Sequence, residues 1–188
     1  MKILLHSCCG PCASSCVERL LSEGWSPTLF YANDNLDSLA EWERRLDALR
    51  TVAAQMDVPY AISPYSPAPW KLAVAEYTHD PEGGRRCALC FRHNFKKTAE
   101  YAIAHGFTHW TTTLSVSPHK NNILLFEAGN DISKEFPTLT FVPIDFKSNN
   151  GFQRSTELAK QYGLYRQNYC GCEYSRRGIF NTEDTEKK

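Results

Sequence analysis

The eight cysteines of this 188-residue chain all fall into three short groups. The groups are Cys8, Cys9, Cys12 and Cys16; Cys87 and Cys90; and Cys170 and Cys172. Independent buried thiols would rarely gather in this way. Thiolates from separate loops can hold zinc or an iron–sulfur cluster, and two neighbouring thiols can form a redox-active disulfide. The pattern therefore indicates metal binding or redox catalysis in a reducing compartment, and not an extracellular disulfide framework.

The adjacent pair Cys8-Cys9 and the distant pair Cys87-x-x-Cys90 offer four thiolates from two loops. A structural zinc site usually takes two C-x-x-C pairs, whereas an iron–sulfur cubane has irons far enough apart for adjacent cysteines. The spacing thus favours a cluster, with zinc as the alternative. It matches neither the C-x3-C-x2-C run of radical S-adenosylmethionine enzymes nor the C-x2-C-x2-C-x3-C run of ferredoxins.

The third group, Cys170-Gly171-Cys172, has the spacing of a small disulfide loop. Residues two apart have Cα atoms roughly 5.5–7 Å apart, which overlaps the disulfide range of about 4.4–6.8 Å. Gly171 permits the required turn, and a strained bond of this kind is readily reduced. The spacing favours a redox-active pair, and the alternative is that both cysteines are metal ligands.

Two cysteines of the first group lie on the helix predicted to follow the first strand. Cys12 stands at the start of that helix, where the helix dipole favours a thiolate. We expect Cys12 either to bind a second metal ion or to donate a proton. Cys16 lies one turn further on and is expected to be an ordinary buried helix residue.

Strands and helices alternate along the chain. We predict strands over residues 3–6, 28–31, 60–62, 108–114 and 139–144, and helices over 12–23, 38–56, much of 70–105 with a turn at 80–84, 124–129 and 155–162. Residues 64–70 are predicted as a proline-punctuated loop. This alternation indicates an α/β fold with a parallel sheet flanked by helices, in which ligands bind at the carboxyl ends of the strands. We expect one domain over residues 1–180 and a flexible tail over residues 181–188.

The chain has no excess of positive charge that would attract nucleic acid, because 21 basic residues balance 21 acidic ones. Contact with RNA would then depend on local groups of residues. The candidates near the cysteines are Arg85, Arg86, Arg92, Lys96, Lys97, Arg176 and Arg177 for phosphate, and Tyr162, Tyr165, Tyr169 and Tyr174 for stacking on bases. Solvated charges and packed rings are the alternatives. No stretch approaches the ~20 apolar residues of a membrane span, so we expect a cytoplasmic protein with no membrane contact.

Four segments together resemble the epoxyqueuosine reductase QueH family. They are residues 6–12 (HSCCGPC), 30–35 (FYANDN), 86–92 (RCALCFR) and 163–175 (GLYRQNYCGCEYS). The resemblance extends over nearly the whole chain, and its closing segment is the most specific part. It implies reduction of epoxyqueuosine to queuosine at the wobble position of tRNA, the last step of queuosine biosynthesis.

The resemblance also implies roles for individual residues. A [4Fe–4S] cluster would be held by Cys8, Cys9, Cys87 and Cys90, and a redox-active disulfide would join Cys170 to Cys172. The partners would be tRNA carrying epoxyqueuosine and an external electron donor, since neither a flavin nor a nicotinamide motif is visible. The family resembles in fold the nucleotide-binding HUP superfamily, which includes the tRNA-modifying ATP pyrophosphatases.

One departure from those pyrophosphatases bears on the choice of reaction. They carry a Ser-Gly-Gly-x-Asp-Ser phosphate loop after the first strand, where this chain has Ser-Cys-Cys-Gly-Pro-Cys over residues 7–12. Pro11 removes a backbone donor for phosphate, which argues against ATP activation. An iron–sulfur tRNA sulfur-transfer enzyme, which needs ATP, is therefore the weaker alternative. A non-catalytic zinc-binding RNA module is the alternative from a different class.

Overall fold

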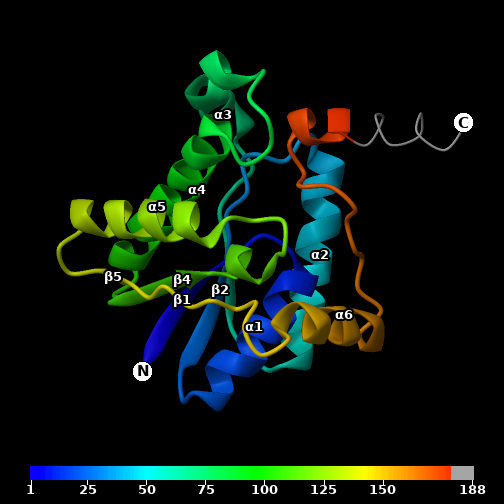
Figure 1. Cartoon of the computed structure of the whole chain (residues 1–188). Coiled ribbons are helices and arrows are strands. Elements are labelled where there is room, and N and C mark those ends of the chain that lie inside the picture. Colours follow the sequence, from blue (N-terminus) through cyan, green and yellow to red (C-terminus); the bar gives the residue numbers. More distant parts are fainter. Residues whose placement is uncertain (179–188) are drawn as a thin grey trace, which may run out of the picture.

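A computed structural model describes residues 1–178 of the chain, and the side chains of residues 1–175. The strands in this part are β1 (Lys2–Ser7), β2 (Ser26–Tyr31), β3 (Tyr60–Ile62), β4 (His109–Thr112) and β5 (Thr140–Phe141). They form one parallel sheet in the order β3-β2-β1-β4-β5 (Figure 1). The predicted α/β fold with a parallel sheet is confirmed.

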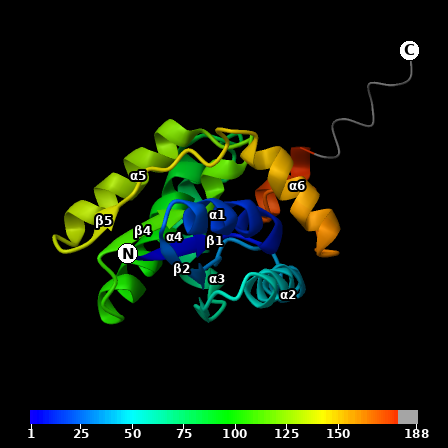
Figure 2. The same cartoon turned by 90° about the horizontal axis from the view of Figure 1, so that it is seen from below.

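Helices cover both faces of the sheet (Figure 1 and Figure 2). The α-helices are α1 (Gly10–Ser22), α2 (Leu39–Gln55), α3 (Pro67–Val74), α4 (Arg85–Ala104), α5 (Asn122–Glu135) and α6 (Gly151–Gln161), and the short 3-10 helices are η1 (Ala75–Tyr77), η2 (Thr113–Val116) and η3 (Glu173–Gly178). In β1, Ile3 and Leu5 pack in the core beneath α1 and α2, whereas Leu4 packs in the core beneath α4 and α5. The central strand is therefore apolar on both faces, as expected for a parallel sheet.

The sequence of β1 and α1 fixes how the chain leaves the sheet. Pro11 occupies the first turn of α1, where its missing N–H costs no helical hydrogen bond. Gly10 allows α1 to approach α2 closely, because a Cβ atom at this position would lie 2.3 Å from the carbonyl oxygen of Ala48. The close packing of these two helices holds residues 8–12 directly beyond the end of β1.

The order of the strands reverses direction at β1. The chain moves outward from β1 through β2 to β3, then returns to add β4 on the other side of β1. Such a reversal leaves the carboxyl ends of the two central strands open to a ligand. Cys8 follows β1 and Thr113 follows β4, and the Cys8 backbone N–H donates to Thr113 Oγ1 at 3.2 Å. The first cysteine group thus lies at this reversal.

Several predicted element boundaries are wrong. The proline-rich loop over residues 64–70 contains the start of α3, since Pro67 lies at the first turn of that helix. The strand predicted over residues 108–114 stops at Thr112, whose hydroxyl accepts from the Leu114 backbone N–H and begins η2. The last strand is reduced to two residues, and α5 and α6 begin earlier than predicted.

The predicted tail over residues 181–188 lies outside the described residues. Within the described part, none of the helices combines the length and the apolar character that crossing a membrane requires.

Candidate metal and redox site

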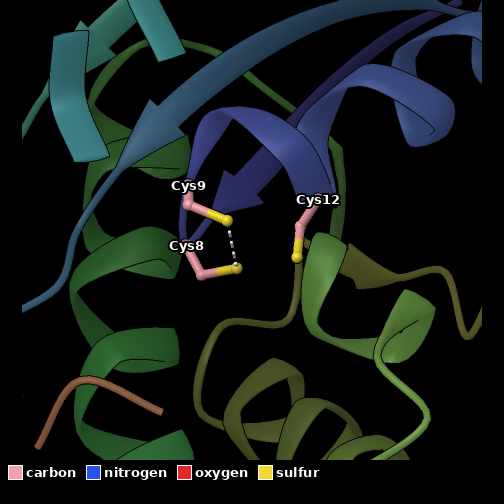
Figure 3. A group of neighbouring side chains, drawn as sticks. All are labelled: Cys8, Cys9 and Cys12. Atoms are coloured by element: carbon pink, nitrogen blue, oxygen red, sulfur yellow. Dashed lines mark hydrogen bonds between the residues drawn. The ribbon is translucent and has the colours of Figure 1, made fainter. Parts of the chain in front are cut away.

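The first cysteine group is built by a single turn of chain. Cys8 follows β1, Cys9 is the N-cap of α1, and Cys12 is in the first turn of that helix. Their three sulfur atoms all lie within 4.8 Å of one another, and the Cys8 and Cys9 sulfurs are 3.7 Å apart (Figure 3). Three convergent thiol groups are suited to a soft metal ion or to an iron–sulfur cluster.

Hydrogen bonds among the three thiols shift their pKa values in different directions. Hydrogen bonds from Cys12 and Cys8 hold the pKa of Cys9 well below its usual value, with help from Arg45 and against the effect of burial. The same bonds to Cys8 and Cys9, together with burial, raise the pKa of Cys12 well above its usual value. These contacts favour ionisation of Cys9 over Cys12, because Cys9 receives hydrogen bonds from both neighbouring thiols. Gln167 Nε2 also donates to Cys9 Sγ at 3.0 Å.

The second and third cysteine groups share one cavity. Cys87 and Cys90 lie in the first two turns of α4, and the cavity that they line is also lined by Cys170 and Cys172. Burial raises the pKa of Cys87 and raises that of Cys90 to about 12. The Gly83 backbone N–H donates to Cys87 Sγ at 3.3 Å.

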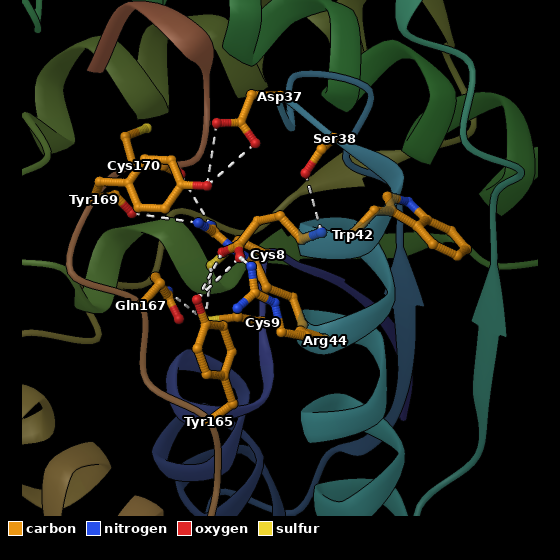
Figure 4. Close-up of polar contacts among 12 residues, drawn as sticks. Cys8, Cys9, Asp37, Ser38, Trp42, Arg44, Tyr165, Gln167, Tyr169 and Cys170 are labelled. Carbon is orange, nitrogen blue, oxygen red and sulfur yellow. Dashed lines mark hydrogen bonds and ion pairs between the residues drawn. The ribbon is translucent and has the colours of Figure 1, made fainter. Parts of the chain in front are cut away.

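A buried ion pair on α2 holds the segment that carries the third group. Arg45 and Glu41 are 2% and 0% exposed and are joined at 2.7 Å. Arg45 donates to the carbonyl oxygens of Cys170 at 3.0 Å and Tyr169 at 3.4 Å. The Tyr165 hydroxyl donates to Glu41 at 3.0 Å (Figure 4). The charges of α2 therefore fix the backbone on which Cys170 stands.

The turn between Cys170 and Cys172 requires a glycine. Gly171 has a φ of +115°, and a Cβ atom there would lie 2.4 Å from Leu36 Cδ2 and 2.8 Å from an Arg45 guanidinium nitrogen. The Gly171 carbonyl accepts from the Asp37 backbone N–H at 2.9 Å. The role predicted for Gly171 in permitting the turn is confirmed, and the close packing on α2 adds a second reason for it.

The two thiols of the third group are free in the structure, and their pKa values shift in opposite directions. A hydrogen bond from Cys172, assisted by Lys120 and opposed by burial, lowers the pKa of Cys170 to about 5. The same hydrogen bond, with burial, raises the pKa of Cys172. Lys120 Nζ lies 3.1 Å from Cys170 Sγ.

The structure thus brings Cys8, Cys9 and Cys12 together, and Cys87, Cys90, Cys170 and Cys172 line one cavity. The loop after β2 borders both places. Asn33 Nδ2 donates to the Ser7 carbonyl at 2.9 Å, next to the first group, and Asn35 lines the cavity of the second. Cys16 is fully buried among apolar residues, as predicted.

Most of the basic residues noted in the sequence have partners inside the molecule. Arg86 is 3% exposed and donates to the carbonyl oxygens of Thr78 and Asp80, so it supports a loop and is not available to phosphate. Lys97 pairs with the buried Asp34 at 2.7 Å. The side chains of residues 176 and 177 lie outside the described part.

The tyrosines near the third group also have structural partners. Tyr165 bonds Glu41, and the Tyr169 hydroxyl lies 3.2 Å from the Asp37 carboxylate. Packing therefore accounts for these two rings better than stacking on a base does.

Sequence reasoning missed the polar residues that surround the cysteines. They are Glu41, Arg45, Trp70, Lys120 and Gln167. The i,i+4 spacing of Glu41 and Arg45 on a predicted helix was a usable signal for an ion pair, although not for its burial. Nothing in the local sequence of Lys120 points to Cys170, since 50 residues separate the two.

A family model described as "Epoxyqueuosine reductase QueH" matches residues 3–178, a range that includes all eight cysteines. The chain belongs to this family. A QueH protein of Streptococcus pyogenes serotype M1 is 35% identical over 182 residues, covering 94% of this chain and 71% of the relative. One of Staphylococcus aureus strain Mu50 is 33% identical over 198 residues, covering 100% and 82%. One of Thermotoga maritima is 31% identical over 176 residues, covering 92% and 89%.

Membership of the QueH family makes the chain an oxidoreductase and confirms the resemblance carried by its cysteine segments. It supports neither the sulfur-transfer enzyme nor the zinc-binding RNA module. The residues also fit a metal group, because three buried or half-buried thiols converge. The indole of Trp70 lines the same cavity, and its N–H lowers the pKa of Cys90 against the larger effect of burial.

Proposed function

We propose that this chain reduces epoxyqueuosine to queuosine in tRNA, with Cys170 and Cys172 as its redox-active pair. The observation that carries the proposal is the QueH family match over residues 3–178, which spans every cysteine of the chain. The cavity around the pair supports it, because thiols and a lysine ammonium lie side by side there.

The chemistry requires a two-electron donor. Conversion of an epoxide to an alkene consumes two electrons and two protons and releases one water molecule. Oxidation of the Cys170 and Cys172 thiols to one disulfide supplies two electrons and two protons, so the reaction balances. An external electron donor must then reduce the disulfide before the next turnover.

We assign the metal group to four of the other six cysteines. Cys8 and Cys9 from the end of β1, with Cys87 and Cys90 from the start of α4, would hold a [4Fe–4S] cluster beside the loop after β2. Such a cluster supplies single electrons when it is bound. Cys12 lies with Cys8 and Cys9 and is the candidate for a second metal ion or for a proton donor.

Iron analysis tests the metal assignment. Protein purified without oxygen should contain about four irons per chain. Cys87→Ser or Cys90→Ser should lose most of this iron, whereas Cys16→Ala should keep it, because Cys16 is buried in the apolar core. Stoichiometric zinc without iron after anaerobic reconstitution would refute the cluster.

Nucleoside analysis tests the reaction. tRNA from a strain that lacks the gene should accumulate epoxyqueuosine, and the purified protein should convert it to queuosine. Cys170→Ser should keep its iron and lose turnover, and the double Ser variant should be no worse than either single variant, because the two thiols act as a unit. Equal turnover of the free nucleoside and of tRNA would contradict the assignment of tRNA as the partner.

A further inference from the structure

We infer that hydrogen bonds from Gln167 to Cys9 and from Thr113 to Cys8 raise the reduction potential of the iron–sulfur group. The inference rests on the [4Fe–4S] cluster proposed above, which has Cys8 and Cys9 among its ligands. Gln167 and Thr113 are positioning residues in this account, because each acts through a cysteine sulfur.

Gln167 makes the shorter of the two contacts. Its Nε2 donates to Cys9 Sγ at 3.0 Å, from the segment that leads to Cys170 (Figure 4). Hydrogen bonds to the cysteine sulfurs are among the features that set the potential of an iron–sulfur cluster. Gln167 therefore places a neutral donor on a sulfur that the cluster would use.

Thr113 is held in position to donate to the neighbouring sulfur. Its Oγ1 accepts from the Cys8 backbone N–H at 3.2 Å, and the same hydroxyl donates to Cys8 Sγ at 3.5 Å. The backbone bond occupies an acceptor position of the hydroxyl oxygen, which leaves the hydroxyl hydrogen for the sulfur. The two adjacent cysteines thus each accept a hydrogen bond from a distant part of the chain.

Burial keeps water from replacing these two donors. Cys9 and Thr113 are 0% exposed, and Cys8 is half-buried. Hydrogen bonds act more strongly where water is excluded. Reduction adds negative charge to a cluster and its sulfurs, so a donor stabilises the reduced state more than the oxidised state. Each of the two bonds should therefore raise the potential.

Two contacts to the other proposed ligands are local to α4 and the turn before it. The Gly83 backbone N–H donates to Cys87 Sγ at 3.3 Å, and Asn94 Nδ2 lies 3.9 Å from Cys90 Sγ. Gln167 differs because it comes from the segment that carries the proposed redox pair. That segment therefore also adjusts the potential of the group that supplies single electrons.

A potentiometric titration tests the inference on anaerobically purified full-length protein whose iron content is measured first. Dithionite supplies the single electron that the cluster takes up, and the EPR signal of the reduced cluster is followed against potential. Gln167→Leu should make reduction about tenfold less favourable, a shift of about 59 mV to more negative potential for a one-electron couple. Gln153→Leu is the matched control, because its amide bonds Glu157 at the surface of α6, and it should keep the wild-type potential.

Two further variants separate tuning of the potential from loss of packing. Gln167→Glu keeps the size of the side chain but places a negative charge where the donor was, so at pH 8 it should lower the potential more than Gln167→Leu does. Thr113→Val removes the buried hydroxyl and should shift the potential in the same direction by a smaller amount. Thr113→Ser keeps a hydroxyl and should restore the wild-type value.

Two results would overturn the inference. One is an unshifted or more positive potential in Gln167→Leu that retains its iron. The other is loss of iron from both Gln167→Leu and Thr113→Val, because the two residues would then serve to hold the cluster. If Gln167→Leu alone loses iron, the comparison of Thr113→Val with Thr113→Ser decides in the same way. Absence of iron from the wild-type protein is a separate outcome, because it would refute the proposed cluster itself.

Discussion

The two cysteine sites of this molecule are assembled in opposite ways. Cys8, Cys9 and Cys12 come from five consecutive residues where β1 passes into α1. The cavity group takes its residues from α3, the start of α4, the loop before α5 and the segment before η3. The first site is local, and the second depends on contacts between distant parts of the chain.

As a result, different interactions hold the two sites in place. The local site is carried by the buried central strand and by close packing of α1 on α2. The segment that brings Cys170 to the cavity has no strand or α-helix of its own between α6 and η3. It depends on side-chain hydrogen bonds from Arg45, Tyr165 and Gln167. Substitutions should therefore damage the cavity site more selectively than the local site.

Arg45→Met should give the largest effect. It removes the 2.7 Å partner of the fully buried Glu41, which keeps only the half-exposed Arg44 at 3.0 Å, and it removes the donors to the Cys170 and Tyr169 carbonyls. We expect the free energy of unfolding to fall by about 4 kcal/mol, measured by urea denaturation. Arg50→Met is the control on the same helix, because Arg50 pairs with Asp47 at the surface, and it should cost less than about 1 kcal/mol. Equal losses in the two variants would contradict the anchoring role of Arg45.

Acid should act on the strand that carries the local site through His6. His6 lies in β1 below Cys8, where its ring contacts Thr112 Oγ1 at 2.9 Å and the Ala32 carbonyl at 3.2 Å. Burial lowers its pKa from 6.5 to about 4, although the bond to Ala32 opposes this shift. The folded state therefore binds the proton more weakly than the unfolded state does.

The contribution of His6 is fully present above pH 6.5 and is lost as the pH falls toward about 4. The loss should reach about 3 kcal/mol. Urea denaturation across this range should show a shallower pH dependence in His6→Gln than in wild type. The exposed His105 provides the control, and His105→Gln should leave the slope unchanged. A wild-type slope in His6→Gln would exclude His6 as the source.

Gly171→Ala should weaken the cavity site specifically. The positive φ of +115° and the 2.4 Å approach to Leu36 Cδ2 both oppose a side chain at this position. We expect a loss of about 2 kcal/mol, together with loss of epoxyqueuosine turnover. Gly163→Ala is the matched control, because Gly163 also has a positive φ, of +62°, but has open space around its Cα. It should cost about 1 kcal/mol and keep turnover. Full turnover by Gly171→Ala would show that the turn tolerates distortion.

The contrast between the local site and the cavity site also explains how much could be predicted from the sequence. The β1 strand, the start of α1 near Pro11 and the edge position of Cys8 follow from local patterns, and all are observed. Residues 33–35 are polar in sequence, yet Asn33, Asp34 and Asn35 are buried with partners from distant elements. No local pattern encodes such pairings.

The residue types near the second and third groups did not reveal their partners, for a related reason. Tyrosines and arginines next to cysteines were candidates for RNA contact, because a sequence does not show which charges are already paired. Arg86 donates hydrogen bonds to backbone carbonyls, and the Tyr165 hydroxyl donates to Glu41. Partners more than 100 residues away, such as Glu41 for Tyr165, become visible only in the folded chain.

Gln167→Leu should give the smallest effect and the most informative one, because Gln167 links the two sites. It lies on the segment that leads to Cys170, and its Nε2 donates to Cys9 Sγ at 3.0 Å. One hydrogen bond to sulfur is removed, so we expect a loss of about 1 kcal/mol in urea denaturation. Gln153→Leu, which removes an exposed contact to Glu157, should change stability by less than about 0.5 kcal/mol.

Hydrogen exchange should become faster over residues 164–170 in Gln167→Leu, while β1 and α1 keep their protection. Faster exchange in β1 and α1 as well would show that the local site depends on the C-terminal segment, and the contrast between the two sites would fail.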